Sequence, residues 1–122
     1  MAIFIIMPCP FPRLLAVAAL LAAGPALAQD EPAPSPSRQA ELVRMVRRDC
    51  GSCHGLLLTG GLGPALTPSA LRELPEEGLT AVIYGGRPGT PMPGWKTMLS
   101  EADAAWIARQ LQAGFPQEPP TP

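Results

Sequence analysis

Two cysteines and the only histidine of the chain lie within five residues, and this cluster restricts the possible folds more than any other feature. The segment Cys50-Gly51-Ser52-Cys53-His54 has the C-x-x-C-H pattern through which haem is attached covalently. On a helical turn, two thiols at this spacing can reach both vinyl groups on one porphyrin edge, and the adjacent imidazole can meet the iron through Nε2. The sequence therefore predicts one haem c, bound through Cys50 and Cys53, with His54 as an axial iron ligand.

Three other kinds of cysteine site fit the sequence less well. A thioredoxin-type redox pair lies near a βαβ pattern, and the chain shows no strand-like alternation. A structural zinc site needs four ligands, and the third cysteine, Cys9, lies in an N-terminal targeting segment and leaves with it. A disulfide between Cys50 and Cys53 would close a small and strained ring.

Residues 1–28 have the pattern of a cleaved Sec signal peptide. Arg13 precedes about ten apolar residues, a Gly-Pro break and an Ala-x-Ala site at Ala26–Ala28. The apolar stretch is too short to span a bilayer, so no stable membrane insertion is expected after cleavage. Several apolar residues precede the positive charge, which favours a start at Met7 over Met1. We expect export to the periplasm and haem attachment there by the cytochrome c maturation machinery.

Three segments follow the signal. Residues 29–37 are rich in Pro and Ser and are expected to form a flexible leader, residues 38–115 the domain, and residues 116–122 a proline-rich, disordered tail. A domain of roughly 80 residues has a marginal hydrophobic core of its own. Aromatic side chains make up only 5% of the chain. A covalently bound haem would supply both the missing apolar mass and a link between segments.

Helical periodicity runs through the domain. The first helix is expected to start near Ser37, as N-cap, and to continue into the cysteine pair. The last helix is expected to start at Ser100, where Asp103 completes a capping box. Short helices are expected between them, around 69–74 and around 76–84. With no strand-like segment, the fold class is all-α.

Met92 is the best candidate for the second axial ligand of the iron. The chain has one histidine, so ligation by two histidines is excluded. Met92 stands between Pro91 and Pro93, and a loop stiffened by prolines loses little entropy when its thioether binds iron. The alternatives are the single lysine and the other methionines of the mature region: Lys96, Met45, which is expected to pack, and Met98, which could belong to the core.

Other residues are candidates for the surroundings of the haem. A ligating histidine usually donates its second ring N–H to a fixed acceptor, and the carbonyl of Pro64 lies in a rigid segment about ten residues after His54. Leu66 is expected to pack on the ring. Trp95 could donate its indole N–H to a haem propionate or belong to the core. Weaker candidates for a propionate contact are Tyr84 and Arg87.

Taken together, these residues resemble class I cytochromes c. The matching pattern covers nearly all of 38–115 and includes the C-x-x-C-H segment, Gly63-Pro64-Ala65-Leu66, the run 90–95 and the closing helix. The resemblance implies a small monohaem cytochrome c fold in which the N- and C-terminal helices cross. It also implies an iron that shuttles between two oxidation states.

A narrower resemblance lies in the runs 49–66 and 85–95. They look like the small periplasmic cytochrome of NirC type, which is associated with haem-cd nitrite reductase in denitrifying bacteria. This resemblance implies electron donation to that reductase or a part in the maturation of its d-type haem. A general respiratory electron carrier with another redox partner protein is the remaining alternative.

The predicted ligand pair and the charge limit the function further. A histidine and a methionine leave no open position on the iron, which favours an electron-transfer protein over an enzyme. A haem enzyme or gas sensor would need Met92 to leave the iron. The mature chain carries eight Lys and Arg against ten Asp and Glu, with no basic run, so nucleic acid is not an expected partner.

Overall fold

The structure is a computed structural model that describes residues 32–118. The predicted signal peptide, the first residues of the leader and residues 119–122 lie outside this range. All regular secondary structure in residues 32–118 is helical, with no strand among them, so the predicted all-α class is confirmed. No helix in residues 32–118 is both long and apolar enough to cross a membrane. The helices are α1 (Pro36–Met45), the π-helical turn η1 (Val46–Cys50), α2 (Gly51–His54), α3 (Pro68–Leu71), α4 (Glu76–Gly85) and α5 (Glu101–Ala113).

Helix α1 begins two residues earlier than expected. Its N-cap is Ser35, whose hydroxyl accepts a hydrogen bond from the backbone N–H of Arg38 at 3.3 Å. The prediction of Ser37 as N-cap is therefore wrong, and the helix takes up the last two residues of the predicted leader. Pro36 explains the difference, because its fixed φ suits the first helical position and it has no N–H to leave unpaired.

Helix α5 begins as predicted. The Ser100 hydroxyl accepts from the N–H of Asp103 at 3.0 Å, and the Asp103 carboxylate accepts from the N–H of Ser100 at 3.1 Å. Two orphan donors of the helix are thus satisfied, and the predicted capping box is confirmed. The short helices differ more: the one expected around 69–74 is helical only over Pro68–Leu71, whereas the one expected around 76–84 extends to Gly85.

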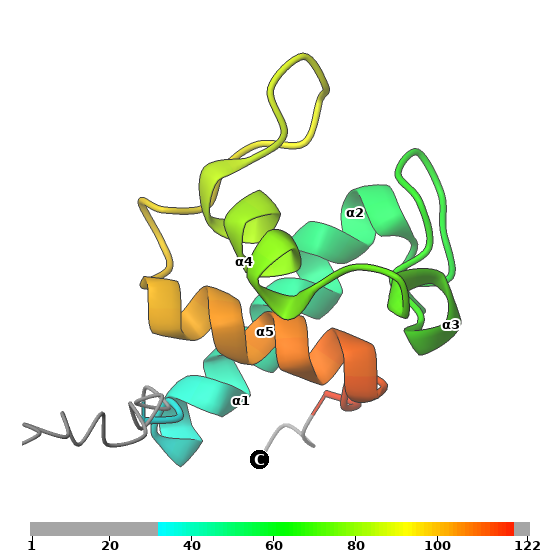
Figure 1. The fold of residues 1–122 in the computed structure, drawn as a ribbon. Helices are drawn as coiled ribbons and strands as arrows, with labels where there is room; N and C mark the ends of the chain where they lie inside the picture. Colours follow the sequence, from blue (N-terminus) through cyan, green and yellow to red (C-terminus); the bar gives the residue numbers. More distant parts are fainter. Residues whose placement is uncertain (1–31, 119–122) are drawn as a thin grey trace, which may run out of the picture.

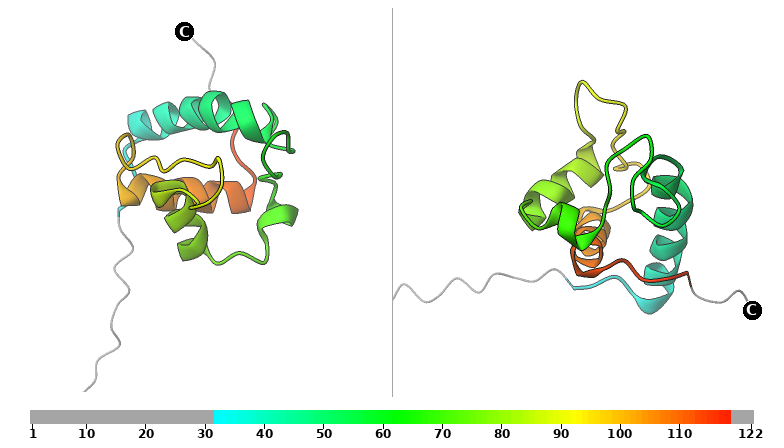
Figure 2. Two further views of the ribbon diagram at one scale, coloured as in Figure 1. Left: turned by 90° about the horizontal axis from the view of Figure 1, so that it is seen from above. Right: turned by 90° about the vertical axis from the view of Figure 1, so that its right-hand side faces the viewer.

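The helices surround one small core, and α5 lies at its centre. In Figure 1, α1 to α2 rise behind α5 and cross its direction, while α4 lies above α5 and α3 beside its C-terminal end. Seen from above, α5 lies between the segment from α1 to α2 on one side and α4 on the other (Figure 2). Only one aromatic ring, that of Trp106, is among the buried hydrophobic residues in the described part. They are Leu42, Val43, Val46, Leu58, Leu71, Leu79, Ile83, Leu99, Ala104, Trp106, Ile107, Ala108 and Leu111.

Two arginines hold the first helical segment to α5 and to the residues that flank it, one near each end of α5. Arg38 donates to the Asp103 carboxylate at 2.9 Å and to the carbonyl oxygen of Met98 at 3.0 Å. Arg47, in η1, donates to the carbonyl oxygens of Phe115 at 2.9 Å and Pro116 at 2.8 Å. Its guanidinium also lies over the Phe115 ring, 5.5 Å from the centroid. These contacts hold the segment after α5, as far as Pro116, to η1.

The Arg38–Asp103 pair makes the stability of the fold depend on pH. Burial raises the pKa of Asp103, but the hydrogen bonds from Arg38 and Ser100 lower it more, so the pKa lies below its usual range. A carboxylate whose pKa is lower in the folded chain stabilises the fold above about pH 4. That contribution is lost as the pH falls through the folded pKa.

We expect Asp103→Asn to lower the free energy of unfolding by about 1–3 kcal/mol at neutral pH, because a buried charged hydrogen-bond acceptor is removed. The difference between the two proteins should shrink as the pH falls below about 4. Chemical denaturation at several pH values measures it. Glu101→Gln, at an exposed position of the same helix, is the control and should change little. A difference that does not vary with pH would contradict the role given to the Asp103 carboxylate.

Candidate haem-attachment site

The C-x-x-C-H segment lies where η1 passes into α2. Cys50 ends the π-helical turn and is partly buried, whereas Cys53 is exposed, and both thiols are free. Burial, with a smaller effect of the Asp49 carboxylate, raises the pKa of the Cys50 thiol to about 11. His54 is the last residue of α2 and is buried.

The His54 imidazole is fixed by a backbone carbonyl. Its Nδ1 lies 2.7 Å from the carbonyl oxygen of Pro64. A carbonyl oxygen can only accept, so Nδ1 carries the proton, and in the neutral ring Nε2 is left with a free lone pair. This is the tautomer that binds a metal through Nε2, with the second N–H held by a fixed acceptor. The contact joins the two residues that the sequence paired; the role of His54 as an iron ligand stays a prediction.

The loop after His54 folds back on α2 to bring Pro64 to the imidazole. The N–H of Gly60 donates to the carbonyl of His54, and the N–H of Gly63 to that of Cys53, both at 2.8 Å. A Cβ at position 63 would lie 2.7 Å from Cε1 and 2.8 Å from Nδ1 of the His54 ring. The loop therefore needs glycine at position 63 because of space and not because of backbone conformation.

Leu58 holds the middle of this loop to the core. It is buried and has a φ of 60°, a left-handed conformation that costs a leucine energy. Its N–H donates to the carbonyl of Gly55 at 2.7 Å, and its own carbonyl accepts from the N–H of Leu66 at 2.8 Å. Leu66 is half-buried against the same core. Nothing in the local sequence signals this conformation of Leu58.

The loop that carries Met92 is closed by hydrogen bonds as well as by prolines. The N–H of Arg87 donates to the carbonyl of Met92 at 3.1 Å. The Thr90 hydroxyl donates to the carbonyl of Arg87 at 2.7 Å and accepts from the N–H of Met92 at 3.3 Å. Thr90 is a positioning residue that the sequence analysis missed, because a hydroxyl in a loop gives no periodic signal.

At the base of this loop the chain comes very close to itself. A Cβ at Gly86, whose φ is 78°, would lie 2.5 Å from the backbone nitrogen of Gly94. A Cβ at Gly94 would lie 2.7 Å from the backbone of Gly85. The N–H of Trp95 donates to the carbonyl of Tyr84 at 3.0 Å, which fixes the loop to the end of α4. In the sequence, only the glycines at 86 and 94, on either side of the loop, indicate that the two backbone segments come so close.

The loop that follows His54 and the loop that carries Met92 lie on the same side of the helices. In Figure 1 the loop after α2 and the loop after α4 both extend above α5, and from above the second loop passes between η1–α2 and α4 (Figure 2). The Met92 side chain is half-buried. The segment after His54 and the loop of Met92 thus lie on the same side of the helices, and ligation by Met92 stays a prediction.

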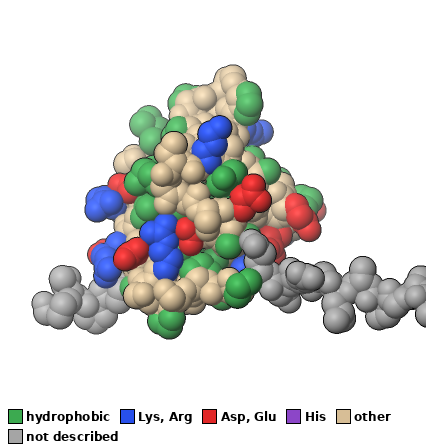
Figure 3. Space-filling view, turned by 90° about the vertical axis from the view of Figure 1, so that its left-hand side faces the viewer, with side chains coloured by type: hydrophobic (Ala, Val, Ile, Leu, Met, Phe, Trp, Pro, Cys, Tyr) green, Lys and Arg blue, Asp and Glu red, His purple; other side chains and the backbone are tan. Residues whose placement is uncertain are grey.

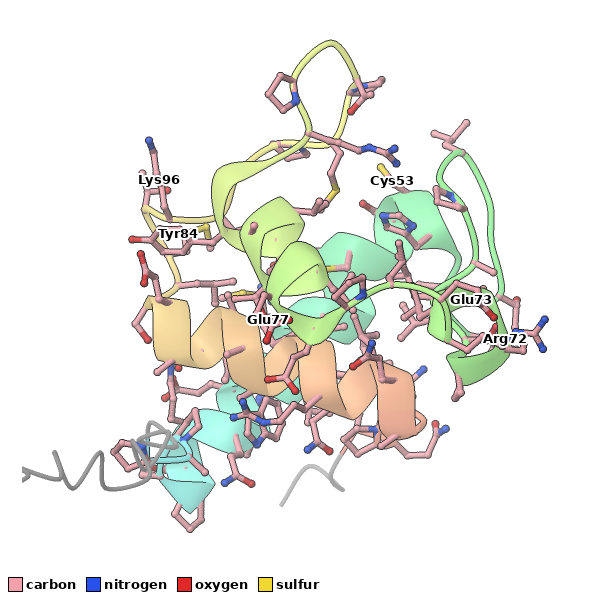
Figure 4. The ribbon with its side chains drawn as sticks, viewed as in Figure 1. Cys53, Arg72, Glu73, Glu77, Tyr84 and Lys96 are labelled. Carbon is pink, nitrogen blue, oxygen red and sulfur yellow. The ribbon has the colours of Figure 1, made fainter. Side chains whose placement is uncertain are left out.

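The other candidates for the second ligand lie elsewhere. Lys96 extends from the side of the molecule opposite Cys53, and so does Tyr84, which was a weaker candidate for a propionate contact (Figure 4). Met45 packs against the core. Met98 is 50% exposed, so the interpretation of Met98 as a core residue is wrong; only its backbone carbonyl takes part in packing, as an acceptor for Arg38.

The environment of the Trp95 indole bears on whether these residues could bind a haem. Its indole Nε1 is buried and has no hydrogen-bond partner among the described residues. A buried N–H without an acceptor lowers the free energy of unfolding, and a hydrogen-bond acceptor on a bound group would remove this cost. Haem carries such acceptors in its propionates, and the chain also offers two free thiols, a metal-binding imidazole tautomer and a thioether. The residues fit the group.

Known proteins share this sequence and fold. Residues 37–109 match the family described as cytochrome C oxidase, cbb3-type, subunit III. Cytochrome c55X of Pseudomonas aeruginosa is 56% identical over 90 residues, which covers 74% of each chain. The solved structure of a c-type cytochrome NirC is 57% identical, covers 66% of this chain and 95% of that one, and has a TM-score of 0.66. Dihydro-heme d1 dehydrogenase of Pseudomonas aeruginosa is 36% identical over 107 residues, which covers 88% of this chain and 20% of the dehydrogenase.

The packing of Gly63 against the imidazole generates a prediction. We expect Gly63→Ala to displace the His54 ring and weaken its bond to Pro64, at a cost of about 1–3 kcal/mol in unfolding free energy. In the haem-loaded protein the same change should shift the reduction potential. Gly85→Ala is the matched control, because a Cβ there meets nothing within 4 Å. Redox titration and thermal unfolding of both variants check this; equal behaviour of the two would contradict it.

Proposed function

The chain belongs to the family of c-type cytochromes that includes cytochrome c55X and NirC, and from this premise we propose that it passes single electrons in the periplasm, to haem-cd nitrite reductase or during its maturation. Membership makes it a monohaem electron-transfer protein and not an enzyme, with one haem c attached covalently. The similarity to the NirC structure, which covers 95% of that chain at 57% identity, supports the link to nitrite reductase. The sequence pattern of residues 1–28 supports export.

We propose that Cys50 and Cys53 form the thioether bonds and that His54 and Met92 are the axial ligands. When bound, haem c supplies an iron that takes up and releases one electron. The observation that carries the proposal is the His54–Pro64 hydrogen bond, since it fixes the ring in the tautomer whose Nε2 is free. In the loop that would supply the second ligand, Thr90 and the flanking prolines hold the Met92 backbone in place. Trp95 supplies a buried N–H for a propionate.

Fixed ligands suit electron transfer because the chain has little to rearrange when the charge of the site changes. Each candidate ligand lies on a segment closed by its own backbone hydrogen bonds. Preorganised groups do not pay an ordering cost at each cycle. Leu58 and Leu66, in the segment after His54, pack against the helical core, so the imidazole moves only if this packing moves.

A second candidate function is assembly of the d-type haem of nitrite reductase. It is favoured by the similarity to dihydro-heme d1 dehydrogenase, which this chain matches over a fifth of that protein's length. The matched part is the size of this cytochrome, so the similarity concerns a cytochrome segment and not the dehydrogenase activity. A general respiratory carrier with another partner is the remaining alternative.

Deletion of the gene in a denitrifying host separates the first two functions. If the cytochrome donates electrons, we expect a nitrite reductase that contains its d-type haem but turns over slowly with physiological donors. If it serves in assembly, the purified reductase should lack the d-type haem. Normal content and normal turnover would contradict both and favour the general carrier. Absorption spectra and turnover of the purified enzyme give the answer.

The assignment of Met92 is tested by spectroscopy of the haem-loaded protein. We expect the oxidised wild type to show a near-infrared band from sulfur ligation and Met92→Ala to lose it completely, since no other side chain takes its place. The ferrous variant should then bind carbon monoxide rapidly at the open position. Met98→Ala, which changes a half-exposed methionine after the same loop, is the control and should keep the band. Loss of the band in Met98→Ala instead would identify Met98 as the ligand.

A further inference from the structure

The loop after His54 exposes an unusual amount of apolar surface. We call residues 55–63 the leucine loop. Leu56 is 72% exposed, Leu57 73% and Leu62 94%, whereas Leu58 in the same loop is 3% exposed. Of the large hydrophobic side chains that are exposed among residues 32–118, three lie in this loop and only two elsewhere, at Leu74 and Met98. Exposed leucines concentrated in one short loop are unfavourable in water unless something covers them.

The leucine loop is held rigidly. Its backbone is tied to α2 by the hydrogen bonds from Gly60 to His54 and from Gly63 to Cys53. It is tied to the following segment by the bond from Leu66 to Leu58. Arg47 adds a hydrogen bond to the carbonyl of Leu56 at 3.4 Å. The side chains are therefore presented outward by a fixed backbone and cannot be withdrawn into the core without breaking these bonds.

The leucine loop and the residues that flank it in the sequence carry no charge. From Gly51 to Leu71 the sequence has no Asp, Glu, Lys or Arg. A shallow groove of about 280 Å³ lies beside Leu57, and the one charged side chain in its lining is Arg47. The guanidinium of Arg47 already donates to the carbonyls of Phe115 and Pro116. In contrast, the side of the molecule opposite the leucine loop carries charges of both signs (Figure 3).

The charge and the size of the leucine-loop surface indicate what kind of protein surface could bind to it. A charged partner surface would lose its hydration here without gaining an ion pair, so the matching surface is uncharged and apolar. Three leucine side chains cover roughly 300–400 Å², about half of the ~800 Å² that each side of a stable protein interface buries. A surface of this size fits a short-lived complex, of the kind that electron-transfer proteins form.

We propose that the leucine loop is the docking surface for an uncharged, apolar patch on the protein with which this cytochrome exchanges electrons. This inference rests on the proposed function, because it takes the partner to be a redox protein of the nitrite reductase system. The loop begins at the residue after His54, so a partner docked on it lies beside the haem-bearing segment. One electron passes from the reduced cytochrome to the oxidised centre of the partner, and no atom is transferred.

The test measures how fast the reduced, haem-loaded cytochrome transfers electrons to purified, oxidised haem-cd nitrite reductase in a stopped-flow instrument. We expect the double variant Leu56→Ser, Leu57→Ser to lower the second-order rate constant about tenfold or more, because two apolar contacts are lost. Leu74→Ser, which changes a leucine that is 48% exposed outside the loop, should stay within about twofold of the wild type. The wild-type rate should change less than about threefold between roughly 20 and 200 mM salt.

Oxidation by ferricyanide, which needs no protein surface, is measured in parallel and should be equal in all proteins. Equal rates with the reductase in the double variant and the wild type would overturn the docking surface while leaving the proposed function intact. A steep fall of the rate with salt would also overturn it, since that result requires charged contacts. A wild-type cytochrome that reacts with ferricyanide but does not reduce the reductase would overturn the proposed function and the docking surface with it.

Discussion

The hydrogen bond between His54 Nδ1 and the carbonyl of Pro64 is the interaction on which the rest of the site depends. To form it, the chain must leave α2 immediately after His54 and return within ten residues. Gly55 permits the exit with a φ of 84°, and the bonds from Gly60 and Gly63 to the end of α2 hold the return. The missing side chain of Gly63 lets the backbone lie against the imidazole. The same loop buries Leu58 and exposes its neighbours, so the ligand geometry and the proposed docking surface come from one backbone path.

Features with a local cause could be predicted from the sequence. The capping box of α5 depends on residues three positions apart, and the all-α class depends on periodicity within each helix. The Pro64 contact was found because a rigid Gly-Pro segment lies about ten residues after a motif that requires an acceptor. The start of α1 was placed two residues late because Ser35 and Ser37 are both good caps. Pro36 decides between them, since proline is favoured at the first helical position.

Features whose cause lies far away in the sequence could not be predicted. Arg47 and Pro116 are 69 residues apart, and nothing near either residue indicates that one donates to the other. The π-helical turn η1 and the left-handed Leu58 are local departures from regular backbone that only tertiary packing can support. Met98, just before the last helix, was considered a possible core residue, yet the fold uses its carbonyl and leaves its side chain half-exposed. In each case the tertiary environment outweighed the intrinsic preference of the residue.

The two arginine contacts explain how so small a core can keep the site in place. Arg38 joins the starts of α1 and α5, and Arg47 joins the start of η1 to the segment after α5. Two attachment points near opposite ends prevent the helices from sliding or turning about each other, which apolar packing alone resists weakly because it has no direction. Arg47 also donates to the carbonyl of Leu56, so the same arginine holds the loop that orients His54. The stiffness that single-electron transfer requires is therefore supplied by directed hydrogen bonds at the ends of the helices, where a core with one buried aromatic ring could not supply it alone.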